Sequence, residues 1–203
     1  LLKNDIDASS LMGGDGKTTY ETIARGEGQS YRGTFDGLGN RVIGLTADKG
    51  LIANNAGTVQ NMEIDSSVFK GDNAGAIAST NNGTISNITG LGNSITGSGS
   101  IGGIVGVNER QGTIRNTEDQ STVIAGDNTI AGGITGTNNG IIQDAQTNSA
   151  TTTNLKTGTA ENMGGITGKN TGKISDVSAH GVTGQEHFTK TAGGIVGNNI
   201  GSI

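Results

Sequence analysis

Short aliphatic runs, each introduced by glycine, return along the chain at nearly regular intervals. The clearest runs read Gly-Gly-Ile-Val/Thr-Gly and occupy residues 102–106, 132–136, 164–168 and 193–197. With two weaker copies before them, the marker glycines lie 25, 28, 30, 32 and 29 residues apart, at Gly50, Gly75, Gly103, Gly133, Gly165 and Gly194. Periods of this length are typical of a solenoid, in which each repeat forms one coil.

The residues that fill each repeat favour strands over helices. Thr and Ile are β-branched and stiff at χ1, and Gly is unfavourable inside a helix. The chain contains 38 Gly without a three-residue glycine period, which excludes a collagen triple helix. The pattern therefore predicts an all-β fold, a right-handed parallel β-helix (β-solenoid) with three short strands per coil. The hand is expected from the general preference for right-handed crossovers.

Period-two alternation after each marker glycine indicates which side chains point inward. The first column is apolar and is expected inside the coil: Leu51, Ala76, Ile104, Ile134, Ile166 and Ile195. The second column mixes aliphatic residues with threonine and is expected to face outward: Ile52, Ile77, Val105, Thr135, Thr167 and Val196. The third column is expected inside, where only a small residue fits: Ala53, Ala78, Gly106, Gly136, Gly168 and Gly197.

A second strand is expected to follow a set of turn glycines in each repeat. These turn glycines are expected at positive φ, where a Cβ would clash: Gly57, Gly83, Gly112, Gly140, Gly172 and Gly201. The inward column of this strand is Val59, Ile85, Ile114, Ile142, Ile174 and Ile203. A weaker third strand is expected at 94–97, 123–126, 154–155 and 182–184, and loops of variable length before it would explain the uneven period.

Residues 1–49 do not show the repeat and are expected to form irregular N-terminal rungs, with short strands near 1–7, 34–35 and 41–43. Residues 50–203 are the solenoid array, with coils that start near residues 50, 75, 103, 133, 165 and 194. Because the last repeat breaks off, we expect the chain to be a fragment of a longer protein whose flanking coils cover its ends.

Composition narrows the range of functions. The net charge is −5 and the pI is about 4.9, so the basic stripe that nucleic-acid binding needs is absent. There is no Cys, and therefore no disulfide framework or thiolate metal site. The apolar runs are too short to span a membrane as helices, so we expect no membrane insertion.

One polar column closes the second strand of five successive repeats: Asn61, Asn87, Asn116, Asp144 and Asp176. The favoured interpretation is an amide ladder, in which each Asn side chain donates to the next along the stack. The alternative concerns Asp144 and Asp176, whose stacked carboxylates would repel each other or hold a cation such as calcium. The nonapeptide calcium motif of other β-rolls is absent.

No residue set predicts catalysis. His180 and His187 do not have a zinc-site spacing and are expected at the surface. The acidic residues are scattered, and a catalytic carboxylate pair cannot be assigned without the register of the coils. Asn82 and Asn87 each begin an Asn-x-Thr glycosylation acceptor pattern, which arises easily by chance in a chain rich in Asn and Thr. We therefore expect no catalytic residue, no cofactor and no metal other than the alternative at Asp144 and Asp176.

Residues 4–9, the segment 33–46 (Gly-Thr-Phe-Asp-Gly-Leu-Gly-Asn-Arg-Val-Ile-Gly-Leu-Thr) and the Gly-Gly-Ile-Val-Gly repeats resemble the GLUG-repeat region. That region occurs in large bacterial surface exoproteins of the filamentous haemagglutinin type and near some IgA-cleaving peptidases. Asn40 stands where the family commonly has His, and residues 50–53 depart from its usual Gly-Leu-Phe-Gly. The resemblance implies an adhesin exported by two-partner secretion to the bacterial cell surface.

We therefore expect a non-catalytic structural and adhesive segment of a secreted surface protein. Its partners would be a host-cell surface or glycan, other bacterial cells in a biofilm, and flanking coils of its own chain. The first alternative is an accessory domain of a secreted IgA-type peptidase. The second is a carbohydrate-active β-helix enzyme, because one fold can host many functions. An ice-binding surface would need flat ranks of outward Thr, and only Thr135 and Thr167 stand in that column.

Overall fold

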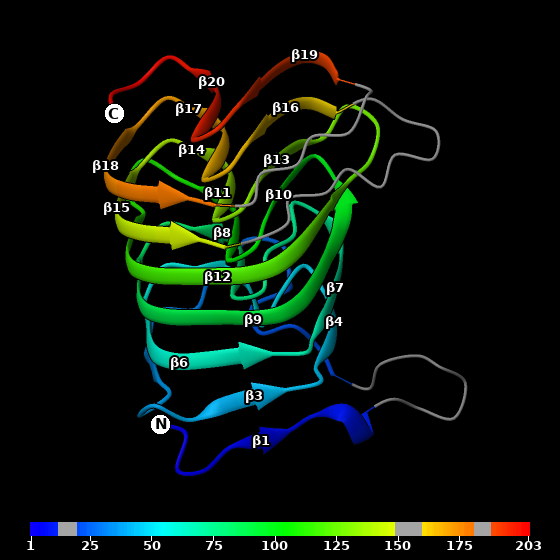
Figure 1. Cartoon of the computed structure of the whole chain (residues 1–203). Coiled ribbons are helices and arrows are strands. Elements are labelled where there is room, and N and C mark those ends of the chain that lie inside the picture. The colour runs from blue at the N-terminus through cyan, green and yellow to red at the C-terminus, as the bar shows by residue number, and fades with distance from the viewer. Residues whose placement is uncertain (12–19, 149–159, 181–187) are drawn as a thin grey trace.

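The structure is a computed structural model that describes residues 1–11, 20–148, 160–180 and 188–203. The described chain winds into a β-solenoid of about five turns whose strands pair in parallel from coil to coil (Figure 1). Its one described helical segment is the 3₁₀ turn η1 (Ser9–Leu11). The predicted all-β parallel solenoid is therefore confirmed.

The front sheet in Figure 1 is the largest and carries the longest strands. Its main path runs through β1 (Ile6–Asp7), β3 (Arg41–Ile43), β6 (Thr58–Asp65), β9 (Thr84–Ser98), β12 (Thr113–Ala125), β15 (Ile141–Thr147) and β18 (Lys173–Ala179). The remaining strands of this sheet are β2 (Thr34–Asp36), β4 (Thr46–Asp48) and β7 (Val68–Asp72).

Two narrower sheets close the coils that begin at β9, β12, β15 and β18. The first consists of β10 (Ser100–Gly102), β13 (Ile130–Gly132), β16 (Ala160–Gly164) and β19 (Phe188–Gly193). The second consists of β5 (Ile52–Asn55), β8 (Ala78–Asn81), β11 (Val105–Asn108), β14 (Thr135–Asn138), β17 (Thr167–Asn170) and β20 (Val196–Asn199). A coil thus visits three sheets in the order β9, β10, β11 before the next coil begins at β12.

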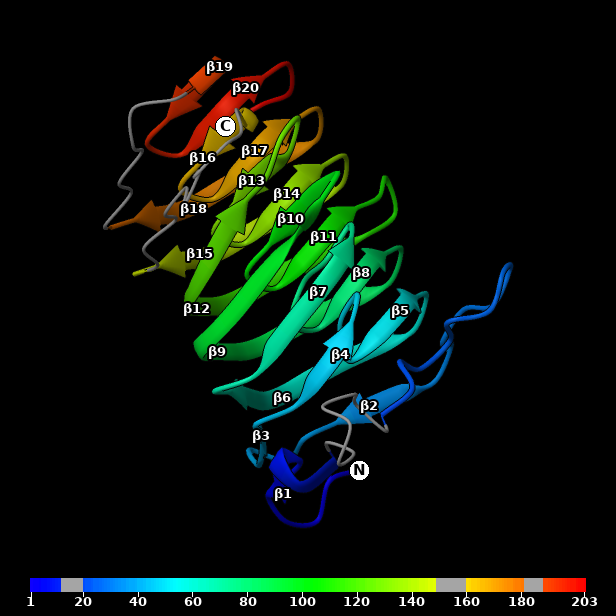
Figure 2. The same ribbon diagram turned by 90° about the vertical axis from the view of Figure 1, so that its right-hand side faces the viewer.

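The coil is right-handed, as predicted. In Figure 1 the front strands run from left to right, the chain returns behind them, and each return lies nearer the C-terminus at the top. The side view in Figure 2 shows the same rise from β4 through β7 to the end of β9.

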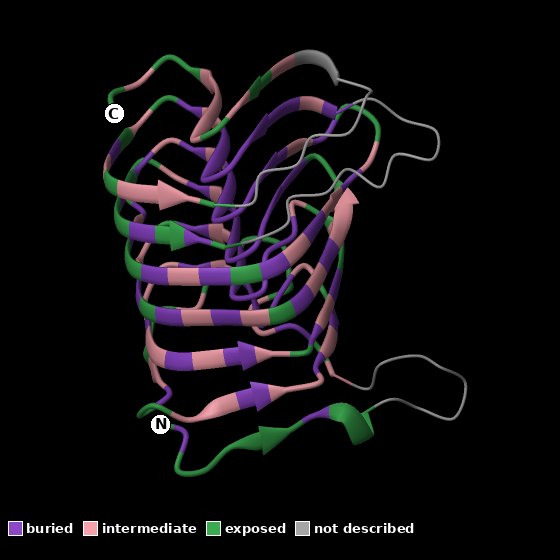
Figure 3. Cartoon of the chain, in the orientation of Figure 1, coloured by how far each residue is buried: buried purple, intermediate pink, exposed green. Residues whose placement is uncertain are grey.

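Aliphatic side chains stack in files inside the coil. Ile104 N donates to Ile134 O at 3.1 Å, and Ile134 N donates to Ile166 O at 3.0 Å, so these three residues lie directly above one another. Each is fully buried. The second-strand file is also confirmed, because its members pair in register and are buried up to Ile174, whereas Ile203 at the open end is 66% exposed. Figure 3 shows the resulting alternation of buried and more exposed positions along β9 and β12.

One coil is offset by a residue from its predicted alignment. Ala78 pairs with both Ile52 and Val105, which places Ile77, not Ala76, in the file of Leu51 and Ile104. The repeat that we align on Gly75 is therefore out of register by one position, and Ala76 takes the place of the marker glycine. The sequence misleads here because Gly75-Ala76-Ile77-Ala78 matches the motif in either register.

The prediction that the second column faces outward is wrong. Ile52, Val105, Thr135 and Thr167 are all completely buried. This column follows directly on the corner of the coil, where β10 and β11 lie against each other. A Cβ added at Gly102 would lie 2.3 Å from Val105 O and 2.4 Å from Thr135 Cα, so the neighbouring strand covers the column. The threonines satisfy their hydroxyl groups locally; for example, Thr135 Oγ1 donates to Thr137 O at 2.9 Å.

The third column is small for the predicted reason. A Cβ at Gly136 would lie 2.5 Å from Ile101 N, and one at Gly106 would lie 2.7 Å from Ser79 O. No ordinary side chain fits where two strands approach this closely. The narrow corner of the coil therefore depends on glycine.

The turn glycines, by contrast, do not have the predicted positive φ. They are required because the coils pass too close to one another for a side chain. A Cβ at Gly83 would lie 2.1 Å from Gly57 O, and one at Gly172 would lie 2.1 Å from Gly140 O. The glycines thus stack in a file through which the backbones of successive coils touch.

The third strand also differs from its prediction. Residues 94–97 and 123–126 mostly belong to the long strands β9 and β12, in which Ile95 pairs with Val123. The strands that close the coil, β10, β13, β16 and β19, begin later in the sequence. The predicted third-strand positions 154–155 and 182–184 lie outside the described residues.

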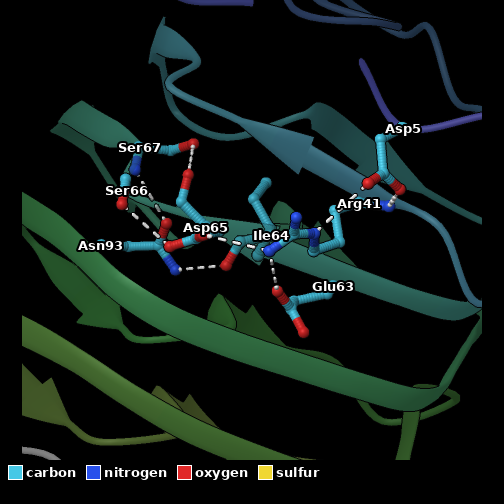
Figure 4. Close-up of polar contacts among 8 residues, drawn as sticks. All are labelled: Asp5, Arg41, Glu63, Ile64, Asp65, Ser66, Ser67 and Asn93. Atoms are coloured by element: carbon cyan, nitrogen blue, oxygen red, sulfur yellow. Dashed lines mark hydrogen bonds and ion pairs between the residues drawn. The ribbon is translucent and has the colours of Figure 1, made fainter. Parts of the chain in front are cut away.

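The N-terminal rungs pair in parallel with the array. Phe35 in β2 pairs with Val59, and Val42 in β3 pairs with Ile64. Figure 4 shows Arg41 between Asp5 on β1's side and Glu63 and Asp65 on β6. Its nearest ion-pair distances are 3.4 Å to Asp5 and 3.5 Å to Glu63. These carboxylates raise the pKa of Arg41, and Asp5 makes the largest contribution. Because the ion pairs are exposed, they add little stability, and their main effect is to hold the register of the neighbouring strands.

A buried ladder of asparagines runs the length of the array, and the sequence prediction missed it. The six residues end the strands of one sheet: Asn55, Asn81, Asn108, Asn138, Asn170 and Asn199. The Nδ2 of each of the first five donates to the Oδ1 of the next at 2.8–2.9 Å. The first five residues are buried. Their spacings of 26, 27, 30, 32 and 29 residues give the true period of the repeat.

The buried hydroxyl group of Thr117 lacks a hydrogen-bond partner in the described structure, whereas that of Thr135 is bonded, so replacing each by a methyl group should change stability in opposite directions. Thr117 is 3% exposed between Ile88 and Ala145, and its Oγ1 has no hydrogen-bond partner in the described structure. We expect Thr117→Val to raise the free energy of unfolding by about 1 kcal/mol, because a methyl group replaces an unsatisfied hydroxyl of similar size. Thr135→Val should lower it by about 1 kcal/mol, because that hydroxyl is bonded. Urea unfolding of both variants checks the two signs, and equal shifts would contradict the assignment.

Candidate binding groove

The polar column at the middle of the front sheet has an unusual backbone. Its five residues all adopt positive φ, between 49° and 55°: Asn61, Asn87, Asn116, Asp144 and Asp176. Asn and Asp tolerate this left-handed region better than other side-chain-bearing residues do. The residue is skipped in the strand pairing, since Ser86 pairs with Arg115 and Ile88 with Thr117 but Asn87 has no paired partner. The five strands β6, β9, β12, β15 and β18 therefore bend at the same position of their coils.

The predicted amide ladder forms over the first part of this column. Asn116 Nδ2 donates to Asn87 Oδ1, and Asn87 Nδ2 donates to Asn61 Oδ1, both at 2.7 Å. Asn61 Nδ2 in turn donates to Asp36 Oδ1 at 3.1 Å. Asp36 also accepts from Gln60 Nε2 at 2.8 Å and from Leu38 N at 2.9 Å. These donors, Gln60 first, hold the pKa of Asp36 below its ordinary value.

The ladder stops at Asn116 because Asp144 and Asp176 have no amide. A carboxylate cannot donate, so the Oδ1 of Asn116 receives nothing from the residue above it. Neither Asp144 nor Asp176 accepts a hydrogen bond from another described side chain. The upper half of the column is thus a row of acceptors whose donors have to come from water or a ligand.

The bend opens a groove that runs along the solenoid axis over four coils. Its volume is about 620 Å³, and it is lined by residues 87–89, 116–118, 144–146 and 176–178. The middle residue of each triplet pairs in the inward file, as Ile88 and Ala145 do. The groove is therefore bordered by the Asn/Asp column on one side and by a second polar row on the other: Thr89, Glu118, Gln146 and Ser178.

Two members of the second row, Glu118 and Gln146, are held by side-chain contacts within the sheet. Gln146 Nε2 donates to Glu118 Oε2 at 3.3 Å, and Gln120 Nε2 donates to Glu118 Oε1 at 2.9 Å. No Lys, Arg or His lines the groove, whereas three carboxylates do. The site can accept hydrogen bonds from a ligand, and it disfavours an anionic one. This second row was not predicted from the sequence, in which the only available signal is its constant offset of two residues from the Asn/Asp column.

The metal alternative for Asp144 and Asp176 stays a prediction. In the part of the chain that the structure describes, no group of three or more His, Cys, Asp and Glu side chains is arranged so that it could hold a metal ion. His180 is exposed and lies beyond the end of β18, and His187 is outside the described residues. In the described ranges, no helix is long and apolar enough to cross a lipid bilayer.

The two glycosylation acceptor patterns have different surroundings. Asn82 is exposed in the bend between β8 and β9, whereas the side chain of Asn87 is engaged in the ladder.

Extending the amide ladder should stabilise the fold. In Asp144→Asn, the new amide can donate to Asn116 Oδ1, and one of the two carboxylates of this column is removed. We expect the free energy of unfolding to rise by about 0.5–1 kcal/mol. Asp144→Gly is the control, because it also permits positive φ and removes the charge but supplies no amide. Thermal unfolding checks the result, and an equal gain in both variants would attribute it to charge alone.

Stability should fall in acid as Asp36 becomes protonated. The folded state lowers the pKa of Asp36 from 3.8, so this carboxylate stabilises the fold above that value and loses its contribution as pH falls through the lowered pKa. We expect the stability difference between wild type and Asp36→Asn to be constant near neutral pH and to shrink below about pH 4. Thermal melts from about pH 2 to pH 7 measure it. A difference that stays constant down to the lowest pH would contradict a lowered pKa.

Comparison with known proteins supports the fold. No family model matches the chain. A sequence relative is halomucin of Haloquadratum walsbyi, 32% identical over 136 residues, which cover 61% of this chain and 1% of halomucin. A structural relative is the crystal structure of a candidate immunoglobulin A1 protease from Bacteroides ovatus, with a TM-score of 0.78 and 21% identity over 98% of this chain. The match spans 66% of that solved chain, so this chain covers less than two thirds of either relative. With 21% identity and a TM-score of 0.78, the comparison shows that the chain shares the β-solenoid fold of the solved protein.

Proposed function

We propose that this chain is a non-catalytic, adhesive segment of a secreted bacterial surface protein. The solenoid would act as a rigid spacer, and the groove over β9, β12, β15 and β18 would be the surface that attaches to a host-cell surface, a glycan or other cells in a biofilm. The observation that carries the proposal is this groove, which repeats the same polar positions on four coils of one rigid sheet.

The sequence supports an extracellular setting. The resemblance of residues 33–46 to the GLUG-repeat region points to exoproteins of the filamentous haemagglutinin type, exported by two-partner secretion. Halomucin, the sequence relative, is named as a mucin, a class of extracellular proteins. An acidic chain without Cys is compatible with export in an unfolded state.

The proposal is tested with the 203-residue chain itself. The chain is immobilised and probed with a glycan array, with cultured host cells and with bacterial biofilm matrix. Retention on at least one of these, without chemical change of the ligand, is expected. Depolymerisation of a polysaccharide by the purified chain would overturn the non-catalytic assignment, and retention on none of the three would overturn the adhesive one.

A second candidate function is an accessory domain of a secreted IgA-type peptidase. The structural match over 98% of this chain favours it. In this case the chain should bind immobilised immunoglobulin A1 more tightly than immunoglobulin G. Equal retention of both immunoglobulins would remove this candidate.

A further inference from the structure

We propose that the groove takes a single linear glycan without acidic groups, which lies parallel to the solenoid axis. This inference rests on the proposed adhesive function and names its ligand class. It depends on three properties of the groove: its direction, the hydrogen-bonding character of its walls and its charge.

The direction follows from the stacking of the coils. The four triplets that line the groove belong to four consecutive strands that pair in register. Paired strands lie about 4.8 Å apart, so equivalent groups repeat at that interval along the axis. An extended glycan repeats its hydroxyl groups at a similar interval, so each sugar can face one coil. A compact ligand would contact the equivalent groups of only one coil.

The walls offer acceptors that need donors. Asn116 Oδ1 receives no amide from the coil above, and Asp144 and Asp176 accept from no other described side chain. Sugar hydroxyl groups are donors, and hydrogen bonds to carboxylates are about twice as strong as those between neutral groups. Thr89 and Ser178 on the other wall are hydroxyl groups, which can donate to ring and hydroxyl oxygens of the same glycan.

The negative charge of the groove disfavours anionic polysaccharides as ligands. Glu118, Asp144 and Asp176 border the groove, and no Lys, Arg or His compensates them among its lining residues. A uronic acid or sulfated glycan in this position would bring its own negative charges close to Glu118, Asp144 and Asp176, and the repulsion between like charges disfavours such a ligand. The groove also lacks aromatic residues, so binding per site is expected to depend on hydrogen bonds rather than on stacking against the sugar rings.

The test compares neutral and acidic oligosaccharides of equal length on the intact chain. The probes are hexamers of β-1,4-glucose, β-1,4-mannose, N-acetylglucosamine and galacturonic acid, measured by calorimetry and by ¹⁵N NMR. At least one neutral hexamer should bind and shift the amide signals of residues 87–89, 116–118 and 144–146. The galacturonic acid hexamer should bind at least about tenfold more weakly.

Variants separate this inference from the proposed function. Glu118→Ala combined with Asp144→Gly should weaken binding of the neutral hexamer about tenfold or more, while Glu27→Ala, which removes an exposed carboxylate outside the groove, should leave it unchanged. Unaltered circular dichroism and a cooperative thermal transition show that the variants fold. Preference for the acidic hexamer, amide shifts outside the groove, or full binding by the double variant would each overturn the inference. If the chain adheres to cells or matrix but no neutral hexamer binds, the inference fails and the adhesive function stands.

Discussion

Gly133→Ala should destabilise the chain by about 3–4 kcal/mol, the largest effect that we expect from a single methyl group here. The added Cβ would lie 2.3 Å from Gly165 O in the coil above and 2.8 Å from Thr147 Cγ2. The obstructing atom is backbone, so no rotamer change relieves the clash. Two coils would have to separate, and this would stretch the hydrogen bond from Gly133 N to Gly165 O, which measures 2.9 Å. Chemical unfolding of the purified variant measures the loss.

Gly194→Ala is a closely matched control. Gly194 occupies the same file as Gly133 but lies in the last coil, where no atom within 4 Å would meet a Cβ. The change is therefore expected to shift stability by no more than about 0.5 kcal/mol. If both substitutions cost the same, the requirement for glycine in this file would be a property of the local backbone and not of coil stacking.

Asn81→Ala should lower the free energy of unfolding by about 3 kcal/mol, because it breaks the buried asparagine ladder at its second residue. Asn81 is completely buried, its Nδ2 donates to Asn108 Oδ1 at 2.9 Å, and its Oδ1 accepts from Asn55 Nδ2 at 2.8 Å and from Gly83 N at 3.2 Å. Truncation leaves several of these groups buried and unpaired, each of which costs about 1–3 kcal/mol. The change in the midpoint of urea unfolding measures the effect.

The neighbouring residue provides the comparison. Asn82 is exposed in the following bend, so Asn82→Ala makes the same chemical change without touching the ladder. Its effect should stay within about 0.5 kcal/mol. A loss for Asn82→Ala as large as that for Asn81→Ala would show that the bend, rather than the ladder, requires the amide.

Gly133 and Asn81 both lie where successive coils are joined. In a solenoid each repeat contacts only its neighbours, so stability is a sum of repeat and interface contributions. Gly133 sets the distance between coils, and Asn81 fixes their register. Both act through the interface, which is why each substitution is expected to affect more than the coil that carries it.

The sequence by itself determined the class of fold. Ile104, Ile134 and Ile166 recur at the period of a coil, and burying them requires that they stack, so the file follows from the hydrophobic effect alone. The same reasoning predicts that Ile85, Ile114 and Ile142 stack in a second buried file. The amide ladder of Asn61, Asn87 and Asn116 could also be predicted, because identical residues at one position of stacked strands meet.

The tertiary structure alone decided which polar positions are buried. Asn108 and Thr135 look like surface residues in the sequence, yet both are completely buried, because the corner of the coil encloses them and supplies hydrogen-bond partners. The register of Ala76 and Ile77 depended on pairing with the coils on either side, since local sequence permits two alignments. The groove likewise required the structure. Its two walls, two residues apart in sequence, form a groove only because Asn116, Asp144 and their equivalents bend the strands β9, β12, β15 and β18 at the same place.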